Sequence, residues 1–78
     1  MRDPDRIPEI LGVLNQLWSK DPDLRFNQLL YNLQSQFAGE NEGRGRIKEA
    51  REDGSARVGF DLFSLEDEEF LRFLRSKV

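Results

Sequence analysis

Residues 20–30 read KDPDLRFNQLL, and this stretch decides how the first half of the chain folds. Asp21 is a favoured residue immediately before a helix, and Pro22 suits the first helical position. Asp23 then complements the positive end of the helix dipole. Apolar residues follow at spacings of three and four, at Leu24, Phe26, Leu29, Leu30, Leu33 and Phe37. The pattern predicts a helix from about residue 22–24 to residue 37.

The same tripeptide, Asp-Pro-Asp, stands at residues 3–5, ahead of another amphipathic stripe. Its apolar members are Ile7, Ile10, Leu11, Leu14, Leu17 and Trp18. We predict a helix over about residues 5–19, with Asp3 and Pro4 as the alternative cap and first residue. The connection between the two stripes is short, so the two helices form an antiparallel hairpin or a helix-turn-helix corner.

The tripeptides also raise the question of calcium, because carboxylates stand at alternate positions. An EF-hand loop needs a third oxygen ligand, a glycine at its sixth position and a final glutamate, and neither tripeptide is followed by these. Capping explains the prolines as well as the acids. We therefore interpret both tripeptides as helix starts.

The C-terminal stretch DLFSLEDEEFLRFLRSKV predicts a third helix over about residues 65–76. Ser64 is the expected N-cap, with Asp67 in the position of a capping-box acid. Acids fill the first turn and cations the last, as the helix dipole favours. Leu62 and Phe63 are expected to fold the preceding chain onto the core.

Residues 38–59 differ in character from the helices on either side. Gly39 is the expected left-handed residue at the end of the second helix. The glycine- and charge-rich run that follows indicates a mobile loop, and residues 47–52 have a helix-forming composition. Asp53-Gly54 is instead a hairpin turn signal. The expected fold is thus all-α: one small domain spanning residues 1–78, with a helical hairpin, a C-terminal helix and a mobile or β-hairpin-like excursion at about 38–59.

Composition restricts the chemistry. The 78 residues include no cysteine and no histidine, so thiolate catalysis, disulfides and the commonest general base and metal ligands are absent. We expect no catalytic residue, no metal and no cofactor, and hence not an enzyme. No apolar run approaches the roughly 20 residues that cross a bilayer, and the N-terminus does not resemble a signal peptide. The expectation is a cytoplasmic protein without a membrane partner.

A small domain with several aromatic residues suggests function by contact. We predict a protein-protein interaction module, either an adaptor or a homodimer. The candidate partner-binding residues are Trp18, Phe63, Glu66, Asp67, Phe70 and Phe73. A tryptophan at helical spacing is more often core, and an acidic first turn is more often simply solvated, so these plainer interpretations stay open.

The alternative is a nucleic-acid-associated regulator of phage or mobile-element origin that uses the segment Arg44–Arg57. Its candidate contacts are Arg44, Arg46, Lys48 and Arg51. A net charge of −3 and the acids interleaved in this segment make nucleic acid the less favoured partner.

Three stretches together resemble a known family. They are RIPEILGVLNQLW, KDPDLRFNQLLYNL and DLFSLEDEEFLRFL. The spacing of Trp18, Pro22-Asp23-Leu24, Gln28-Leu29, Asp61 and Glu66-Asp67 is similar to that of the YihD-type family of small uncharacterised bacterial and prophage proteins. The resemblance covers about 50 residues and omits 38–59. It implies a mostly helical cytoplasmic fold and no assigned activity.

Overall fold

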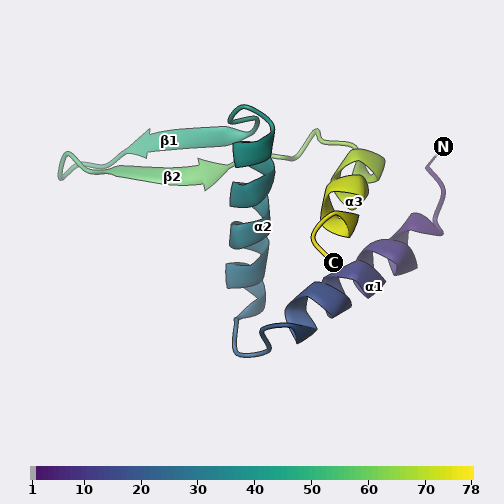
Figure 1. The fold of residues 1–78 in the computed structure, drawn as a ribbon. Helices are drawn as coiled ribbons and strands as arrows, with labels where there is room; N and C mark the ends of the chain where they lie inside the picture. Colours follow the sequence, from purple (N-terminus) through teal and green to yellow (C-terminus); the bar gives the residue numbers. More distant parts are fainter. Residues whose placement is uncertain (1) are drawn as a thin grey trace.

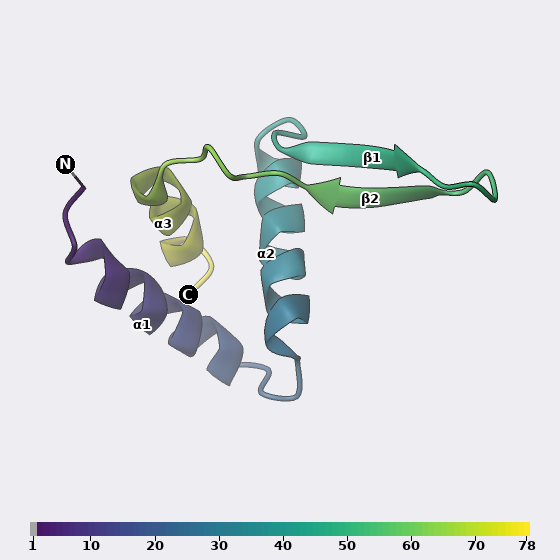
Figure 2. The same cartoon turned by 180° about the vertical axis from the view of Figure 1, so that it is seen from behind.

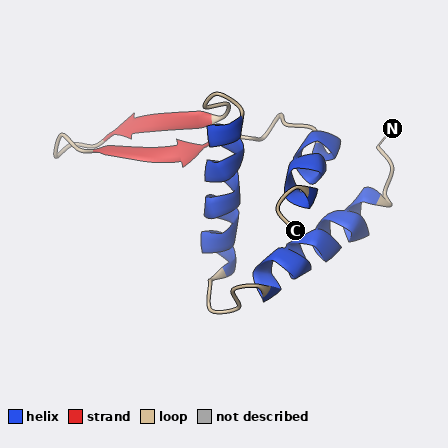
Figure 3. Cartoon of the chain, in the orientation of Figure 1, coloured by secondary structure: helices blue, strands red, loops and turns tan. Residues whose placement is uncertain are grey.

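The computed structural model describes residues 2–78, and within this range it contains helices and strands. The elements are α1 (Arg6–Ser19), α2 (Phe26–Glu40), β1 (Arg46–Ala50), β2 (Ala56–Phe60) and α3 (Asp67–Arg75) (Figures 1 and 3). Helix accounts for 49% and strand for 13% of the chain. The fold is therefore a small mixed α/β fold, and the all-α prediction is wrong. The excursion expected at 38–59 contains the β-hairpin that was one of its two predicted forms.

The first Asp-Pro-Asp tripeptide does open a helix. The carboxylate of Asp3 accepts a hydrogen bond of 2.9 Å from the backbone N–H of Asp5, and its carbonyl accepts one of 3.3 Å from Arg6. The helix itself begins at Arg6 with Asp5 as its N-cap, which is the first of the two predicted starts, and the carboxylate of Asp3 stabilises the turn just before it. α1 ends at Ser19, and the predicted range of 5–19 is confirmed to within one residue.

The second tripeptide forms a turn, and its predicted role as a helix start is wrong. The carbonyl of Asp21 accepts a hydrogen bond of 3.2 Å from the N–H of Leu24. The carbonyl of Leu24 in turn accepts the indole N–H of Trp18 at 2.8 Å. A half-buried indole N–H needs an acceptor, and this carbonyl supplies it. Arg25 is extended, with a ψ of 150°, so the helix begins only after it.

α2 begins at Phe26, where the side chain of Gln28 accepts the backbone N–H of Arg25 at 2.8 Å. Gly39 lies inside the helix, so its predicted role as the left-handed end is wrong. The side-chain amide of Asn41 donates instead to the carbonyl of Phe37 at 2.8 Å. The chain then reverses through left-handed residues, which are Glu42, Gly43 and Gly45.

β1 and β2 pair antiparallel, with Ala50 opposite Ala56 at the outer end. The N–H of Gly54 donates to the carbonyl of Arg51 at 3.0 Å, and Gly54 has a φ of 86°. This is the hairpin connection that closes with a left-handed glycine. The Asp53-Gly54 signal was therefore decisive, and it overcame the helical composition of residues 47–52.

α3 starts two residues later than predicted, with Glu66 as its N-cap. Ser64 does not cap it, because residues 62–65 form a turn in which the N–H of Leu65 donates to the carbonyl of Leu62 at 3.0 Å. Leu62 packs against the core as expected. Phe63 does not, since it is 96% exposed.

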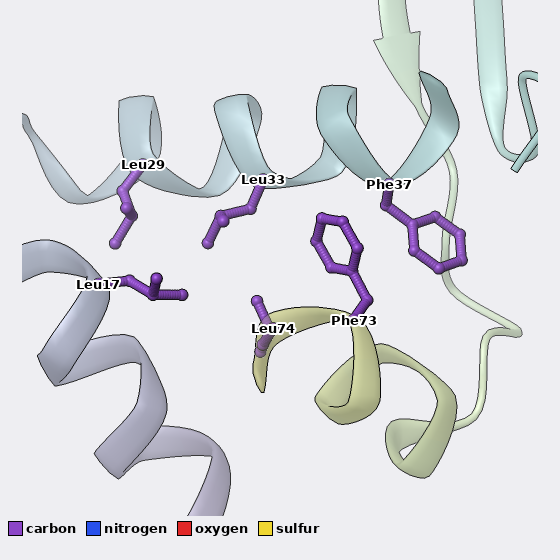
Figure 4. Packing of buried hydrophobic residues seen from close by; sticks show 6 residues of the cluster. All are labelled: Leu17, Leu29, Leu33, Phe37, Phe73 and Leu74. Carbon is purple, nitrogen blue, oxygen red and sulfur yellow. The ribbon is translucent and has the colours of Figure 1, made fainter. Parts of the chain in front are cut away.

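One hydrophobic core joins the three helices. Its buried members are Leu17 of α1, Leu29, Leu33 and Phe37 of α2, and Phe73 and Leu74 of α3 (Figure 4). Phe37 and Phe73 meet edge to face, with ring centroids 5.4 Å apart. Each side chain of this size stabilises the fold by about 1.5–3 kcal/mol when buried. The core contains no residue of the hairpin.

The hairpin projects from the end of α2, on the side away from α1 and α3 (Figures 1 and 2). The radius of gyration is 14.2 Å, against about 11.5 Å for a compact chain of this length. The edge-to-face contact of Tyr31 with Phe60, at 5.3 Å, joins the base of the hairpin to α2. The molecule is therefore a three-helix body with an extended β-arm. None of the described helices has the length and apolar character that crossing a membrane requires.

Candidate functional site

The aromatic residues predicted to bind a partner differ widely in exposure. Phe73 is buried and Phe70 packs against the core, so the fold itself uses both. Trp18 is half-buried, held by its hydrogen bond to Leu24 and stacked at 5.3 Å on Phe26. Phe63 is presented to solvent, with its N–H bonded to the carboxylate of Asp61 at 3.1 Å. Trp18, like Phe70, is half-buried against the core, so Phe63 is the candidate aromatic that is fully presented to a partner.

The two acidic candidates are paired with arginines near the N-terminus. Glu66 contacts Arg2 at 3.0 Å, and Asp67 contacts Arg6 at 2.6 Å. The hydrogen bond and the charge of Glu66 raise the pKa of the Arg2 guanidinium. Both pairs border a cleft of about 660 Å³ between the N-terminal end of α1 and α3. Acids and arginines alternate around it, so these side chains fasten α3 to α1 rather than present a surplus of one charge.

An apolar ridge runs along α1. Its members belong to the apolar stripe from which this helix was predicted. Ile7 is 52% and Leu11 61% exposed, while Leu14 and Trp18 are half-buried and pack against the core. At 100° per residue, these four side chains fall within about 60° of one another around the helix. Phe26, 44% exposed, extends the ridge beyond Trp18. We call these five residues the α1 ridge.

The surroundings of the ridge carry almost no charge. Of the whole chain, 35% of the residues are charged, yet residues 7–19 include a single charged side chain, Glu9. Glu9 lies on another side of the helix, where it contacts Arg75 of α3 at 2.8 Å. The sequence carried a signal for this surface, because residues 7–19 include seven large apolar side chains, which make a stripe wider than one small core can cover.

Of the four candidate nucleic-acid contacts, one forms an ion pair within the described part of the chain and three do not. Arg44 contacts Glu69 of α3 at 2.6 Å and lies 5.9 Å from the centre of the Phe37 ring. Arg46, Lys48 and Arg51 are exposed, and none of them makes an ion pair within residues 2–78. Arg44 thus holds the base of the β-arm, while the other three stand along it.

The pairing of the strands sorts the side chains of the arm onto two faces. Arg46 is opposite Phe60 and Lys48 is opposite Val58, so both cations share one face with apolar residues and no acid. Glu49 is opposite Arg57 on the other face, where the two charges balance. We call the side of the arm with Arg46 and Lys48 the basic face.

The described part of the chain places no three acidic side chains close enough together to hold a metal ion. Comparison of the chain with known protein families, with curated proteins and with solved structures gives no match. The resemblance to the YihD-type family therefore rests on the sequence pattern alone. The α1 ridge and the β-arm are the two surfaces of the fold that bear on its function.

Proposed function

We propose that this chain is a non-catalytic interaction module of the cytoplasm that forms a homodimer, and that the α1 ridge is the contact surface. The observation that carries the proposal is the ridge itself. It is apolar, three of its five members (Ile7, Leu11 and Phe26) are exposed, and residues 7–19 carry a single charged side chain on a chain that is otherwise rich in charge. Phe63, the most exposed aromatic, lies on the turn before α3 and is not needed for this contact.

The spacing of the ridge favours a second copy as the partner. Its four members on α1 are Ile7, Leu11, Leu14 and Trp18, at intervals of four, three and four residues. This order is the same in either direction, so two antiparallel α1 helices place Ile7 opposite Trp18 and Leu11 opposite Leu14, twice over. A two-fold dimer requires such a self-complementary surface.

The net charge of the chain also favours a second copy as the partner. Each copy has a net charge of −3, so two copies repel one another unless they meet through neutral surfaces. The α1 ridge supplies such a surface, and the acids of the chain lie elsewhere. A strongly basic partner would gain nothing from this face, because the face offers it no carboxylate.

The dimer is expected to be weak. A helix of 14 residues is about 21 Å long, and one face of it offers roughly half of the ~800 Å² per partner that a standard interface buries. We expect a dissociation constant on the order of 10 µM, so that dimers form at high local concentration.

The decisive variant is Leu11→Glu, which places a carboxylate near the centre of the ridge. Leu11 is 61% exposed, so the monomer should keep its stability to within about 0.5 kcal/mol. We expect sedimentation equilibrium at 100 µM to give a dimer for the wild type and a monomer for the variant. Trp18, the only tryptophan, supplies a second readout, because its fluorescence should change on dilution of the wild type alone.

Mixing provides the test of two-fold contact. Leu11→Glu and Leu11→Lys should each be monomeric, but an equimolar mixture should form a heterodimer, because the two position-11 side chains then attract across the symmetry axis. Phe63→Ser is the matched control: it removes a more exposed aromatic and should leave the dimer unchanged. A wild type that stays monomeric at 100 µM, or a dimer that survives Leu11→Glu, would overturn the proposal.

A further inference from the structure

The β-arm concentrates the unpaired positive charge of the molecule. Of the twelve lysines and arginines, five make ion pairs within the described chain: Arg2, Arg6, Arg44, Arg75 and Lys77. Four of the remaining seven lie between residues 46 and 60, and they are Arg46, Lys48, Arg51 and Arg57. The rest of the chain is acidic. Residues 46–60 also include Glu49, Glu52 and Asp53, so the arm has a net charge of +1 and the rest of the chain a net charge of −4.

The position of the arm matters because it separates these unpaired cations from the acidic body. A strand of five residues is about 17 Å long, and the arm projects clear of the three helices (Figure 2). Arg46 stands at the base of the arm and Lys48 about 7 Å further along the strand, so salt screens the acids of the body more effectively from Lys48 than from Arg46.

We propose that the basic face of the β-arm binds duplex DNA through its phosphates, with Arg46 and Lys48 as the contacts. A two-stranded β-ribbon fits the major groove of B-form DNA, which is about 12 Å wide. The corresponding groove of duplex RNA is too narrow and deep for it. The cross-strand partners of these cations, Phe60 and Val58, are apolar, so no carboxylate on that face competes with phosphate.

The chemistry of the face predicts binding without base specificity. The ladder presents two cations and no amide side chain on the basic face, and Arg51 adds a charge near the turn. Affinity should therefore come from counterion release, with a dissociation constant on the order of 10–100 µM at low salt and a steep loss as salt rises.

The test is fluorescence anisotropy of a labelled 20-base-pair DNA of random sequence, titrated with the full chain in 25 mM and 150 mM KCl. We expect saturable binding at the lower salt. Arg46→Ala with Lys48→Ala should weaken it at least tenfold and reduce the slope of log affinity against log salt by about two. The exchange variant Arg46→Lys with Lys48→Arg keeps both charges and should bind like the wild type.

Two control variants show whether DNA binding belongs to the arm alone. Arg72→Ala removes an unpaired cation of α3 and should leave binding intact, because α3 belongs to the acidic body. Leu11→Glu tests independence from the α1 ridge: if it prevents dimer formation, the monomer should still bind. No anisotropy change at 25 mM KCl, equal binding by the double alanine variant, or equal binding of duplex RNA would overturn the inference.

Discussion

Gly45 lies where the chain enters β1, and its missing side chain lets two segments pass close together. It has a φ of 83°, and a Cβ placed there would lie 2.3 Å from the end of the Leu62 side chain. Its carbonyl accepts the N–H of Asp61 at 2.7 Å, so the two segments are joined at this point. Gly54, at the outer turn, has a similar φ of 86° but open space around it.

These two glycines allow backbone strain to be separated from crowding. We expect Gly54→Ala to lower the free energy of unfolding by about 1 kcal/mol, for the left-handed backbone alone. Gly45→Ala should lower it by about 2–4 kcal/mol, because Leu62 must also move out of its packed position. Urea unfolding followed by circular dichroism measures both. Equal effects of the two substitutions would contradict the close contact with Leu62.

At the scale of single residues, the sequence predicts roles where one residue type has one dominant use. Asp53-Gly54 is such a case, because few residue pairs suit a hairpin turn so well. It does not predict roles that depend on distant contacts. The indole of Trp18 bonds to the carbonyl of Leu24 in the turn before α2, and Asp67 pairs with Arg6 instead of capping α3. Both outcomes depend on residues brought together only by the folded chain.

At the scale of elements, the hairpin turn should respond to acid. The hydroxyl and the N–H of Ser55 both donate to the carboxylate of Asp53, at 2.6 and 2.9 Å. The hydroxyl bond, followed by the backbone bond, lowers the pKa of Asp53. A carboxylate with a lowered pKa stabilises the turn above its unfolded pKa of about 3.9, and this contribution is lost as the pH falls through the lower, folded value.

We therefore expect these hydrogen bonds of the turn to be lost as the pH falls below about 4. The amide proton of Ser55, followed by NMR, should lose its hydrogen-bonded shift over this range, while the amides of the helical core residues change less. Asp53→Asn keeps an acceptor oxygen but no longer titrates, so in this variant the shift of Ser55 should be independent of pH. The same transition in Asp53→Asn would show that another group controls the turn.

The elements themselves were predictable to different degrees. α1 was confirmed because its stripe is long, its cap is local and nothing competes with either. The segment 38–59 contained conflicting signals, since helical composition and a hairpin turn overlapped there, and the turn won. The exposed surfaces were harder to predict from the sequence than the elements. The width of the α1 stripe indicated that part of it would stay uncovered, but only the packing of α3 against α1 shows that Ile7 and Leu11 are the exposed part.

At the scale of the whole molecule, the body and the arm are expected to be separable. The core cluster and the residues packed against it lie within the three helices, the turn before α2 and the segment that leads into α3, and the arm contributes no residue to them. An isolated two-stranded hairpin is only marginally stable in water. The arm therefore depends on its attachment at Gly45 and Arg44, whereas the body should fold without the arm.

A shortened chain tests this separation. Arg46 and Phe60 are directly opposite one another, so residues 47–59 can be replaced by the two-residue turn Asn-Gly. We expect the helical signal and cooperative unfolding to remain, with a loss of at most about 2 kcal/mol. In the Leu11→Glu background, where the chain is expected to be monomeric, X-ray scattering should show the radius of gyration falling from 14.2 Å to about 11 Å.

The same shortened chain, with Leu11 restored, distinguishes the two proposed activities. Because the α1 ridge lies on the body, the dimer measured by sedimentation should survive removal of the arm. Binding to duplex DNA should be lost, because Lys48 is gone and Arg46 no longer stands on a projecting ribbon. Loss of the dimer together with the arm would mean that the hairpin, rather than α1, joins the two copies. Non-cooperative unfolding would mean that the body needs the arm in order to fold.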